Sequence, residues 1–355
     1  MPTLFDPVQA GALTLPNRII MAPLTRCRAA PGRVPTALMA EYYRQRASAG
    51  LIINEATAIS PTAVGYPDTP GLWSAEQVAG WKLVTDAVHE AGGRIVAQLW
   101  HVGRISDPEH LAGALPVAPS AIAPKGHPAL LRPKRDYVTP RALETDEIPG
   151  IIADYARAAA NAREAGFDGV EIHGANGYLP HQFLNPLTNL RTDSYGGPVE
   201  NRARFLLEAT DAAIGVWGAE RVGVHISPQG PDNDMPLEAD PEATFGYLLQ
   251  ELSARGIAFL FVRAAEGSPG DMPLLRQTFK GTYIANGNYD ADSAAAAVAS
   301  GKADAVSFGR PYIANPDLVA RIAAKAPLNA LVLEALQGGD AYGYTDYPVL
   351  ADAAE

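Results

Sequence analysis

Cysteine is nearly absent from this chain, since Cys27 is the only one in 355 residues. A single thiol cannot form an internal disulfide, and it cannot supply the several sulfur ligands of a cysteine-rich structural zinc site. This scarcity fits a reducing compartment. We therefore expect a cytoplasmic protein in which Cys27 is an inert, small apolar side chain.

Long apolar runs and an excess of positive charge are also missing. The chain has no stretch of about 18 consecutive apolar residues, which a transmembrane helix needs. Its first residues, MPTLFDPVQAG, lack the basic region and apolar core of a signal peptide. With 28 Lys and Arg against 39 Asp and Glu, the net charge of −11 argues against nucleic acid or an anionic membrane as the main partner. We expect a soluble globular protein.

A recurring series of short apolar runs is the main pattern that the sequence does contain. Their continuous hydrophobicity is typical of strands that are covered on both faces, as in parallel sheets. The eight runs are NRIIMAP (17–23), GLIINEA (50–56), RIVAQLW (94–100), GVEIHGA (169–175), VGVHISP (222–228), IAFLFVR (257–263), TYIANG (282–287) and AVSFGR (305–310).

Helical patterns fill the intervals between these runs. They are expected over residues 37–49, from a capping box at Ser74 to Ala91, and over 150–165, 199–217, 241–255, 290–300 and 316–325. A glycine that could form a left-handed C-cap precedes five of the strands, at Gly50, Gly92, Gly166, Gly256 and Gly301. This alternation predicts an α/β protein, a single (β/α)₈ TIM barrel domain over residues 1–355. An open dinucleotide-binding sheet is less favoured because no G-x-G-x-x-G follows the first strand.

Three segments stand outside this alternation. Residues 2–16, around Gly11, predict an N-terminal hairpin lid across one end of the barrel. The stretch between Trp100 and Ile148 is a long loop after strand 3, and loops of this length usually serve binding. The tail from Pro327 to Glu355 carries three tyrosines, so we expect it to pack back on the barrel.

Active sites of such barrels gather side chains from the carboxyl ends of the strands. The fourth run continues into a polar turn with His173, Asn176 and Tyr178, two hydrogen-bond donors and a phenol that could hold an oxygen and supply a proton. The other strand ends contribute Pro23, Thr25, Ala56, Gln98, His101, His225, Arg263, Asn286, Gly287, Gly309 and Arg310.

The ends of strands 7 and 8 favour a phosphate site, because Gly287 and the Gly309-Arg310 pair stand before short helices. No lysine lies at a strand end for a Schiff base, and no two acids face the mouth as in a glycosidase. A neutral, hydrogen-bonding pocket suits a cofactor that performs the redox step itself. The alternative is a metal-dependent barrel hydrolase that uses His101, His173 and His225 as zinc ligands.

Several long motifs resemble the Old Yellow Enzyme family of FMN-dependent ene-reductases, especially its N-ethylmaleimide reductase group. They are LFDPVQAGALTLPNRIIMAPLTR (4–26), QLWHVGR (98–104), HGANGYLPHQFLNPLTNLRTDSYGGPVENR (173–202), FGRPYIANPDL (308–318) and GYTDYP (343–348). The resemblance covers almost the whole chain. It implies non-covalent FMN at the barrel mouth, NAD(P)H as reductant, no metal, and a monomer or homodimer. The implied substrates are activated alkenes, namely enones, enals, maleimides and nitroalkenes.

The resemblance also implies a role for each matching residue. NAD(P)H would reduce FMN, whose N5 then gives hydride to the β-carbon of the alkene, while Tyr178 protonates the α-carbon. His173 and Asn176 would hydrogen-bond the activating oxygen, and Tyr66 and Trp100 would shape the substrate pocket. The flavin ring would be lined by Pro23, Thr25, Ala56 and Gln98, and the phosphate held by Asn286, Gly287, Gly309 and Arg310.

Two positions depart from the family pattern. Strand 5 usually reads R-[IL]-S-P, but here His225 replaces the arginine that would face the N1 and O2 edge of the flavin. Histidine has a reference pKa of about 6.5, so we hypothesise that a partly charged His225 leaves the flavin harder to reduce above neutral pH. If this loss impairs turnover, the protein is a flavin binder or sensor. Gln337 stands where relatives often carry an aromatic residue, which would change the shape of the substrate site.

Overall fold

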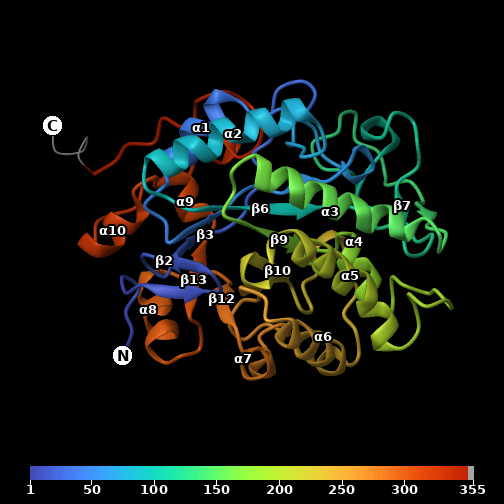
Figure 1. Ribbon diagram of the computed structural model, residues 1–355. Coiled ribbons are helices and arrows are strands. Elements are labelled where there is room, and N and C mark those ends of the chain that lie inside the picture. The colour runs from blue at the N-terminus through green and yellow to red at the C-terminus, as the bar shows by residue number, and fades with distance from the viewer. Residues whose placement is uncertain (351–355) are drawn as a thin grey trace.

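Eight parallel strands close into a barrel in the computed structural model, which describes residues 1–350 (Figure 1). Around the ring, each strand pairs with its neighbours, β13 pairs with β3, and β4 pairs with β6, so the ring is complete. The predicted (β/α)₈ barrel is therefore confirmed. Its strands are β3 (Ile19–Met21), β4 (Leu51–Ile53), β6 (Ile95–Trp100), β9 (Gly169–His173), β10 (Val222–Ile226), β11 (Phe259–Arg263), β12 (Thr282–Asn286) and β13 (Ala305–Phe308).

Helices surround the ring, as the apolar stripes of the sequence predict (Figure 1). The capping box at Ser74 is present, with Gln77 N donating to Ser74 Oγ over 3.3 Å. The helices expected from the sequence are α1 (Ala37–Arg44), α2 (Ala75–Glu90), α3 (Ile148–Glu164), α5 (Val199–Trp217), α6 (Pro241–Arg255), α8 (Ala291–Ala299) and α10 (Leu318–Ala324). Three short helices were not predicted, namely α4 (Leu179–Leu184), α7 (Pro273–Thr278) and α9 (Arg310–Ala314). Short pairings add β5 (Thr57–Ala58), β7 (Val117–Ala118) and β8 (Arg141–Ala142).

Four of the five glycines that were expected to be left-handed before a strand have that conformation. Gly92, Gly166, Gly256 and Gly301 have φ values of 80°, 86°, 67° and 74°, which is the left-handed region that favours glycine. The prediction is wrong at Gly50, which is not left-handed. A Cβ there would lie 2.2 Å from the Asn17 carbonyl oxygen, so lack of space accounts for the glycine.

The N-terminal hairpin closes the amino end of the barrel. Strands β1 (Val8–Ala10) and β2 (Leu13–Leu15) pair antiparallel on either side of Gly11, whose φ is 57°. Their buried side chains pack against the barrel interior, in one cluster with residues such as Leu51 and Phe259. Ala12 N also donates to the carbonyl oxygen of Glu220 over 2.8 Å. The predicted lid therefore seals the end opposite to the carboxyl ends of the strands.

The C-terminal tail packs on the barrel through an arginine–tyrosine clamp, which consists of Arg26, Arg46, Tyr42 and Tyr344. The rings of Tyr42, on α1, and Tyr344, in the tail, stack with centroids 4.1 Å apart. The Arg46 guanidinium lies 3.8 Å from the Tyr42 ring centroid, and Arg26 lies 4.8 Å from that of Tyr344. The expectation for the tail is met up to residue 350, and residues 351–355 lie outside the described part.

No helix within residues 1–350 has both the length and the apolar character that crossing a bilayer would require.

Candidate active site

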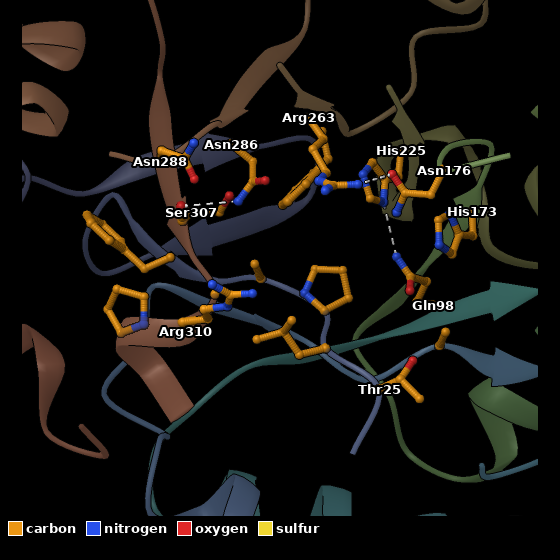
Figure 2. Close-up of a pocket in the computed structure, with 18 of the residues that line it drawn as sticks. Thr25, Gln98, His173, Asn176, His225, Arg263, Asn286, Asn288, Ser307 and Arg310 are labelled. Atoms are coloured by element: carbon orange, nitrogen blue, oxygen red, sulfur yellow. Dashed lines mark hydrogen bonds between the residues drawn. The ribbon is translucent and has the colours of Figure 1, made fainter. Parts of the chain in front are cut away.

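A cavity of about 480 Å³ opens at the carboxyl ends of the barrel strands (Figure 2). Side chains from β6, β9, β10, β11, β12 and β13, and from the segments that follow β3 and β4, converge on it. Most residues predicted for the site line it: Pro23, Thr25, Ala56, Gln98, His173, Asn176, Tyr178, His225, Asn286, Gly309 and Arg310. The structure thus brings together residues that are up to 287 positions apart, since 310 − 23 = 287.

Four predicted site residues do not line this cavity. Tyr66 and Trp100 flank Tyr178 in a small aromatic cluster beside the cavity. Gly287 directly follows β12 and lies against the segment after β11, so a Cβ on it would come within 2.1 Å of the Ala264 carbonyl oxygen. Gln337 is exposed in the tail and does not line this cavity, so its influence on substrate shape stays a prediction.

Tyr178, the N-cap of α4, is held as a neutral phenol. Its hydroxyl lies 3.0 Å from the hydroxyl of Tyr66, and its ring packs edge-on against Trp100 and His173, with centroids 5.1 Å and 5.0 Å apart. Burial raises the pKa of Tyr178 above its usual value. The group therefore keeps its proton at neutral pH until a stronger base takes it.

Asn176 is fixed by three hydrogen bonds. Its φ of 55° is in the left-handed region, which asparagine tolerates better than most residues. Its backbone N–H donates to Ser227 Oγ over 2.7 Å, and its carbonyl oxygen accepts from Asn233 Nδ2 over 2.7 Å. Its side-chain Oδ1 accepts from Arg263 Nη1, also over 2.7 Å. The carboxamide nitrogen Nδ2 is then the group that Asn176 can offer to a ligand.

His173 and His225 stack on one wall of the cavity, with ring centroids 4.9 Å apart and an interplanar angle of 8°. Burial, with a smaller contribution from the charge of Arg263, lowers the pKa of His173 to about 3. Burial likewise lowers the pKa of His225 well below its usual value. Both imidazoles are therefore neutral at pH 7 in the protein alone, whereas the sequence suggested a partly charged His225. His173 Nδ1 and His225 Nε2 are buried without a hydrogen-bond partner in residues 1–350.

Gln98 connects this wall to a buried acid. Its Nε2 donates to Glu171 Oε2 over 2.6 Å and lies 3.3 Å from His225 Nδ1. Burial raises the pKa of Glu171 to about 8, so this side chain is largely a neutral carboxylic acid at pH 7. Glu171 does not line the cavity, which leaves the cavity wall around Gln98 uncharged.

The opposite side of the cavity is suited to an anion. Arg310, the first residue of α9, is exposed, and none of the hydrogen bonds or ion pairs in the described part of the chain involves its guanidinium. Asn286 Nδ2 donates to the Ser307 carbonyl oxygen only over a long 3.4 Å. A phosphate here could take a bidentate pair from Arg310. The unpartnered imidazole nitrogens at one end and the unpaired guanidinium at the other fit FMN, a polar ring system with a phosphate tail.

The cavity also contains residues without a role predicted from the sequence, and Arg263 is the most important of them. The sequence places it at the end of strand 6 but assigns it no function. Strand periodicity gave a signal, because Arg263 lies two positions after Phe261 and must point to the same face. Both residues do line the cavity, together with Asn288, Tyr289 and Phe308.

The alternative of a metal-dependent hydrolase is not supported. Among residues 1–350, no group of three or more His, Cys, Asp and Glu side chains could hold a metal ion. His101, one of the three proposed ligands, is buried away from the cavity, and its Nδ1 accepts from the Gly103 N–H over 3.1 Å. The proposed triad is therefore never assembled.

Comparison with known proteins gives the family of this chain. The model of the NADH:flavin oxidoreductase / NADH oxidase family matches residues 3–329. The chain is 45% identical over 367 residues to a putative 12-oxophytodienoate reductase 5 of Oryza sativa subsp. japonica, covering 99% of this chain and 96% of the relative. It is also 45% identical over 356 residues to a probable flavin mononucleotide-dependent alkene reductase of Leishmania infantum, with 98% and 97% covered.

Solved structures show the same relationship. A structure of morphinone reductase in complex with tetrahydroNAD superposes with a TM-score of 0.96 at 51% identity, covering 100% of this chain and 99% of the other. The Old Yellow Enzyme homologue from Zymomonas mobilis gives a TM-score of 0.94 at 48% identity, with 98% and 100% covered. With a matching family model, close relatives of equal length and a shared fold, this chain belongs to the NADH:flavin oxidoreductase / NADH oxidase family, that is, to the FMN-dependent Old Yellow Enzymes.

Proposed function

We propose that this protein is an NAD(P)H:alkene oxidoreductase that reduces carbon–carbon double bonds activated by a carbonyl or nitro group. The substrate class comprises enones, enals, maleimides and nitroalkenes. One observation carries the proposal: His173, Asn176 and the protonated Tyr178 line one cavity, so two donors and an acid can act on one small molecule.

When FMN is bound in this cavity and has been reduced by NAD(P)H, the flavin supplies the hydride for the alkene. The residues proposed to border its ring are Pro23, Thr25, Ala56, Gln98 and His225, all of which line the cavity. Its phosphate would be held by Asn286, Gly287, Gly309 and Arg310. The unpaired Arg310 guanidinium supports this assignment, because it is free to pair with an incoming anion.

The donors on the opposite wall act on the activating oxygen. Asn176 offers Nδ2, since its Oδ1 is already occupied by Arg263. His173 is neutral, so one of its ring nitrogens carries a proton that can be donated to the same oxygen. Donors that are already oriented toward developing negative charge lower the barrier of such a reaction. They draw electron density out of the double bond and make its β-carbon a better hydride acceptor.

Tyr178 then supplies the proton to the α-carbon. Its raised pKa keeps the phenol protonated at neutral pH. The Tyr66 hydroxyl, 3.0 Å away, can return a proton to it after each turnover. Tyr66 and Trp100 pack against Tyr178 in the aromatic cluster beside the cavity, which shields this part of the site from water.

The test is an anaerobic experiment on the freshly purified protein. We expect a yellow protein that releases FMN on denaturation, is bleached by NADPH, and regains its colour when 2-cyclohexenone is added. Cyclohexene, which has no activating oxygen, is the matched control and should restore no colour. A flavin that is reduced but never reoxidised by any activated alkene would instead favour a flavin binder or sensor. A colourless protein that does not bind FMN would refute the proposal.

A further inference from the structure

Arg263 places a guanidinium in the cavity that the proposed function leaves without a role. Its neighbour two positions earlier, Phe261, is the register partner of His225 on the adjacent strand, with ring centroids 4.5 Å apart. Because side chains two residues apart share a face of a strand, Arg263 points inward above Phe261. Figure 2 shows its side chain directed toward the side of the cavity that holds His225 and Asn176.

One nitrogen of Arg263 makes two contacts. Nη1 donates to Asp232 Oδ2 over 2.6 Å and to Asn176 Oδ1 over 2.7 Å. Asp232 belongs to the short 3₁₀ turn Asp232–Asp234 in the loop that follows β10. This ion pair is 43% exposed at the arginine and 35% at the aspartate, so it adds little to stability. Its effect is to hold the guanidinium at the carboxamide of Asn176.

The contact determines which end of that carboxamide faces a substrate. A carboxamide has an oxygen that accepts and a nitrogen that donates. With Oδ1 held by Arg263, Nδ2 is free to donate to an activating oxygen. If the group turned over, Nδ2 would face the donors of Arg263, and Oδ1 would face the oxygen of the substrate. Both of these contacts are repulsive, so Arg263 selects the productive orientation.

Arg263 also supplies a positive charge on the side of the cavity where β10, the fifth strand of the barrel, carries His225. Of the side chains that line the cavity, Arg263 and Arg310 are the two permanent cations, and Arg310 stands at the start of α9. His173 and His225, stacked beside Arg263, are neutral. On the His225 side of the cavity, the fixed positive charge therefore comes from β11, the strand that pairs with β10.

We propose that Arg263 is a positioning residue for alkene reduction, which keeps the Asn176 N–H directed at the activating oxygen and provides the fixed cation that stabilises reduced FMN. This proposal rests on the proposed function. It differs from the hypothesis drawn from strand 5 alone, which locates the deficit of charge at His225.

The experiment compares holoenzymes of the wild type, Arg263→Gln, Arg263→Lys, His225→Arg and Asp232→Asn at one pH. The first measurement is the FMN midpoint potential, which does not depend on turnover. The second is the binding of cyclohexanone, a saturated ketone that cannot be reduced by this route, followed by the change in flavin absorbance. The Asp232→Asn variant is the matched control, since asparagine keeps an oxygen that can accept from Arg263 Nη1 and removes only the negative charge.

We expect Arg263→Gln to weaken the binding of reduced FMN relative to oxidised FMN at least tenfold, a fall of about 30 mV for a two-electron couple. Cyclohexanone should bind at least tenfold more weakly to this variant, while Arg263→Lys should recover most of the potential because it restores the charge. His225→Arg should change the ratio of the two FMN affinities less than threefold. Asp232→Asn should keep ketone binding within threefold and should not lower the potential.

Three results would overturn the inference. If both Arg263 variants kept the ratio of the affinities for reduced and oxidised FMN, and the affinity for the ketone, within twofold of the wild type, both roles would be excluded. Tighter FMN binding by Arg263→Gln at an unchanged potential would mean that the guanidinium only fills the cavity before FMN enters. If His225→Arg raised the FMN midpoint potential by as much as Arg263→Gln is expected to lower it, the missing positive charge would be assigned to position 225. A wild type that does not bind FMN would refute the proposed function as well, whereas an enone-reducing wild type with unaffected Arg263 variants would refute this inference alone.

Discussion

At the scale of single residues, Tyr178 shows how surroundings turn a common side chain into a usable acid. A phenol in water is already neutral at pH 7, and burial beside Trp100 and His173 raises its pKa further. What the site adds is position: Tyr178 lines the cavity, and its hydroxyl lies 3.0 Å from the Tyr66 hydroxyl. The chemistry assigned to Tyr178 can therefore be separated from binding.

We predict that Tyr178→Phe slows reduction of an enone by the reduced enzyme by about 10²-fold or more, the usual contribution of a general acid. Reduction of the flavin by NADPH should stay within threefold, because no proton from Tyr178 is needed in that half-reaction. Stopped-flow absorbance measures the two halves separately. Tyr66→Phe is the matched control, and it should slow alkene reduction less than tenfold. Equal slowing of both half-reactions by Tyr178→Phe would contradict the assigned role.

The sequence predicts these residues unevenly, for physical reasons. His173, Asn176 and Tyr178 follow an obvious buried strand, and their position at a strand end suffices to place them in the mouth. Arg263 also ends a strand, but its partners Asp232 and Asn176 come from other loops, and strand periodicity carries no information on such contacts. Gln337 lies in a tail without periodicity, so the sequence offered no reliable way to place its side chain.

At the scale of elements, the arginine–tyrosine clamp connects the tail to the helix that carries Arg310. Arg46 follows α1 and donates through Nε to the Tyr312 carbonyl oxygen over 2.9 Å, and through Nη2 to that of Ile313 over 2.7 Å. Both carbonyls belong to α9. A planar guanidinium can serve several carbonyls while it stacks on a tyrosine, and an ammonium group cannot match this geometry.

We predict that Arg46→Lys lowers the free energy of unfolding by about 2–3 kcal/mol, since hydrogen bonds from charged donors are lost in a buried site. FMN should also bind more weakly, because α9 loses part of its support. Arg44→Lys is the matched control: it lies two residues earlier, is exposed and pairs with Glu41, so we expect a change below about 0.5 kcal/mol. Urea unfolding and FMN titration measure the two effects. Equal changes in the free energy of unfolding and in FMN affinity for both variants would show that the Arg46 contacts support neither the fold nor FMN binding.

Elements were predictable where one face of the chain is regularly apolar, as in the barrel strands and the longer helices. The helices α4, α7 and α9 have only five or six residues, too few for a periodic pattern to stand out. Gly50 was misread because the same residue type serves left-handed caps and crowded contacts alike, and only the position of Asn17 distinguishes the two. The clamp was beyond reach, since stacking of Tyr42 on Tyr344 depends on how the closed barrel brings them together.

At the scale of the whole molecule, buried neutral histidines make stability depend on pH. Burial lowers the pKa of His101 to about 3, of His173 to about 3 and of His181 to about 4. The unfolded chain takes up protons on these groups near pH 6.5, while the folded protein does not. Their contribution to stability is therefore complete above about pH 6.5 and is lost as the pH falls toward 4.

Lowering the pH from 7 to 5 should decrease the free energy of unfolding of both proteins. We predict that the decrease is about 2 kcal/mol smaller for His101→Asn than for the wild type. Asparagine Oδ1 can accept from the Gly103 N–H as His101 Nδ1 does, and asparagine takes up no proton in this range. Urea unfolding at saturating FMN gives the two free energies. His127→Asn, in an exposed loop, is the control and should follow the wild type. Parallel losses in all three proteins would show that His101 does not contribute.

The closure of the ring has a consequence for how the protein is made. Residues 19–21 pair with residues 306–308, so the first barrel strand leaves the ribosome long before its partner exists. Until β13 has been made, one edge of β3 has no partner strand, and an uncovered edge invites pairing with other chains. Because the clamp needs Tyr344, it can form only after residue 344 has been made. Chains truncated before β13 should therefore be rich in aggregates, because neither the ring nor the clamp can close in them.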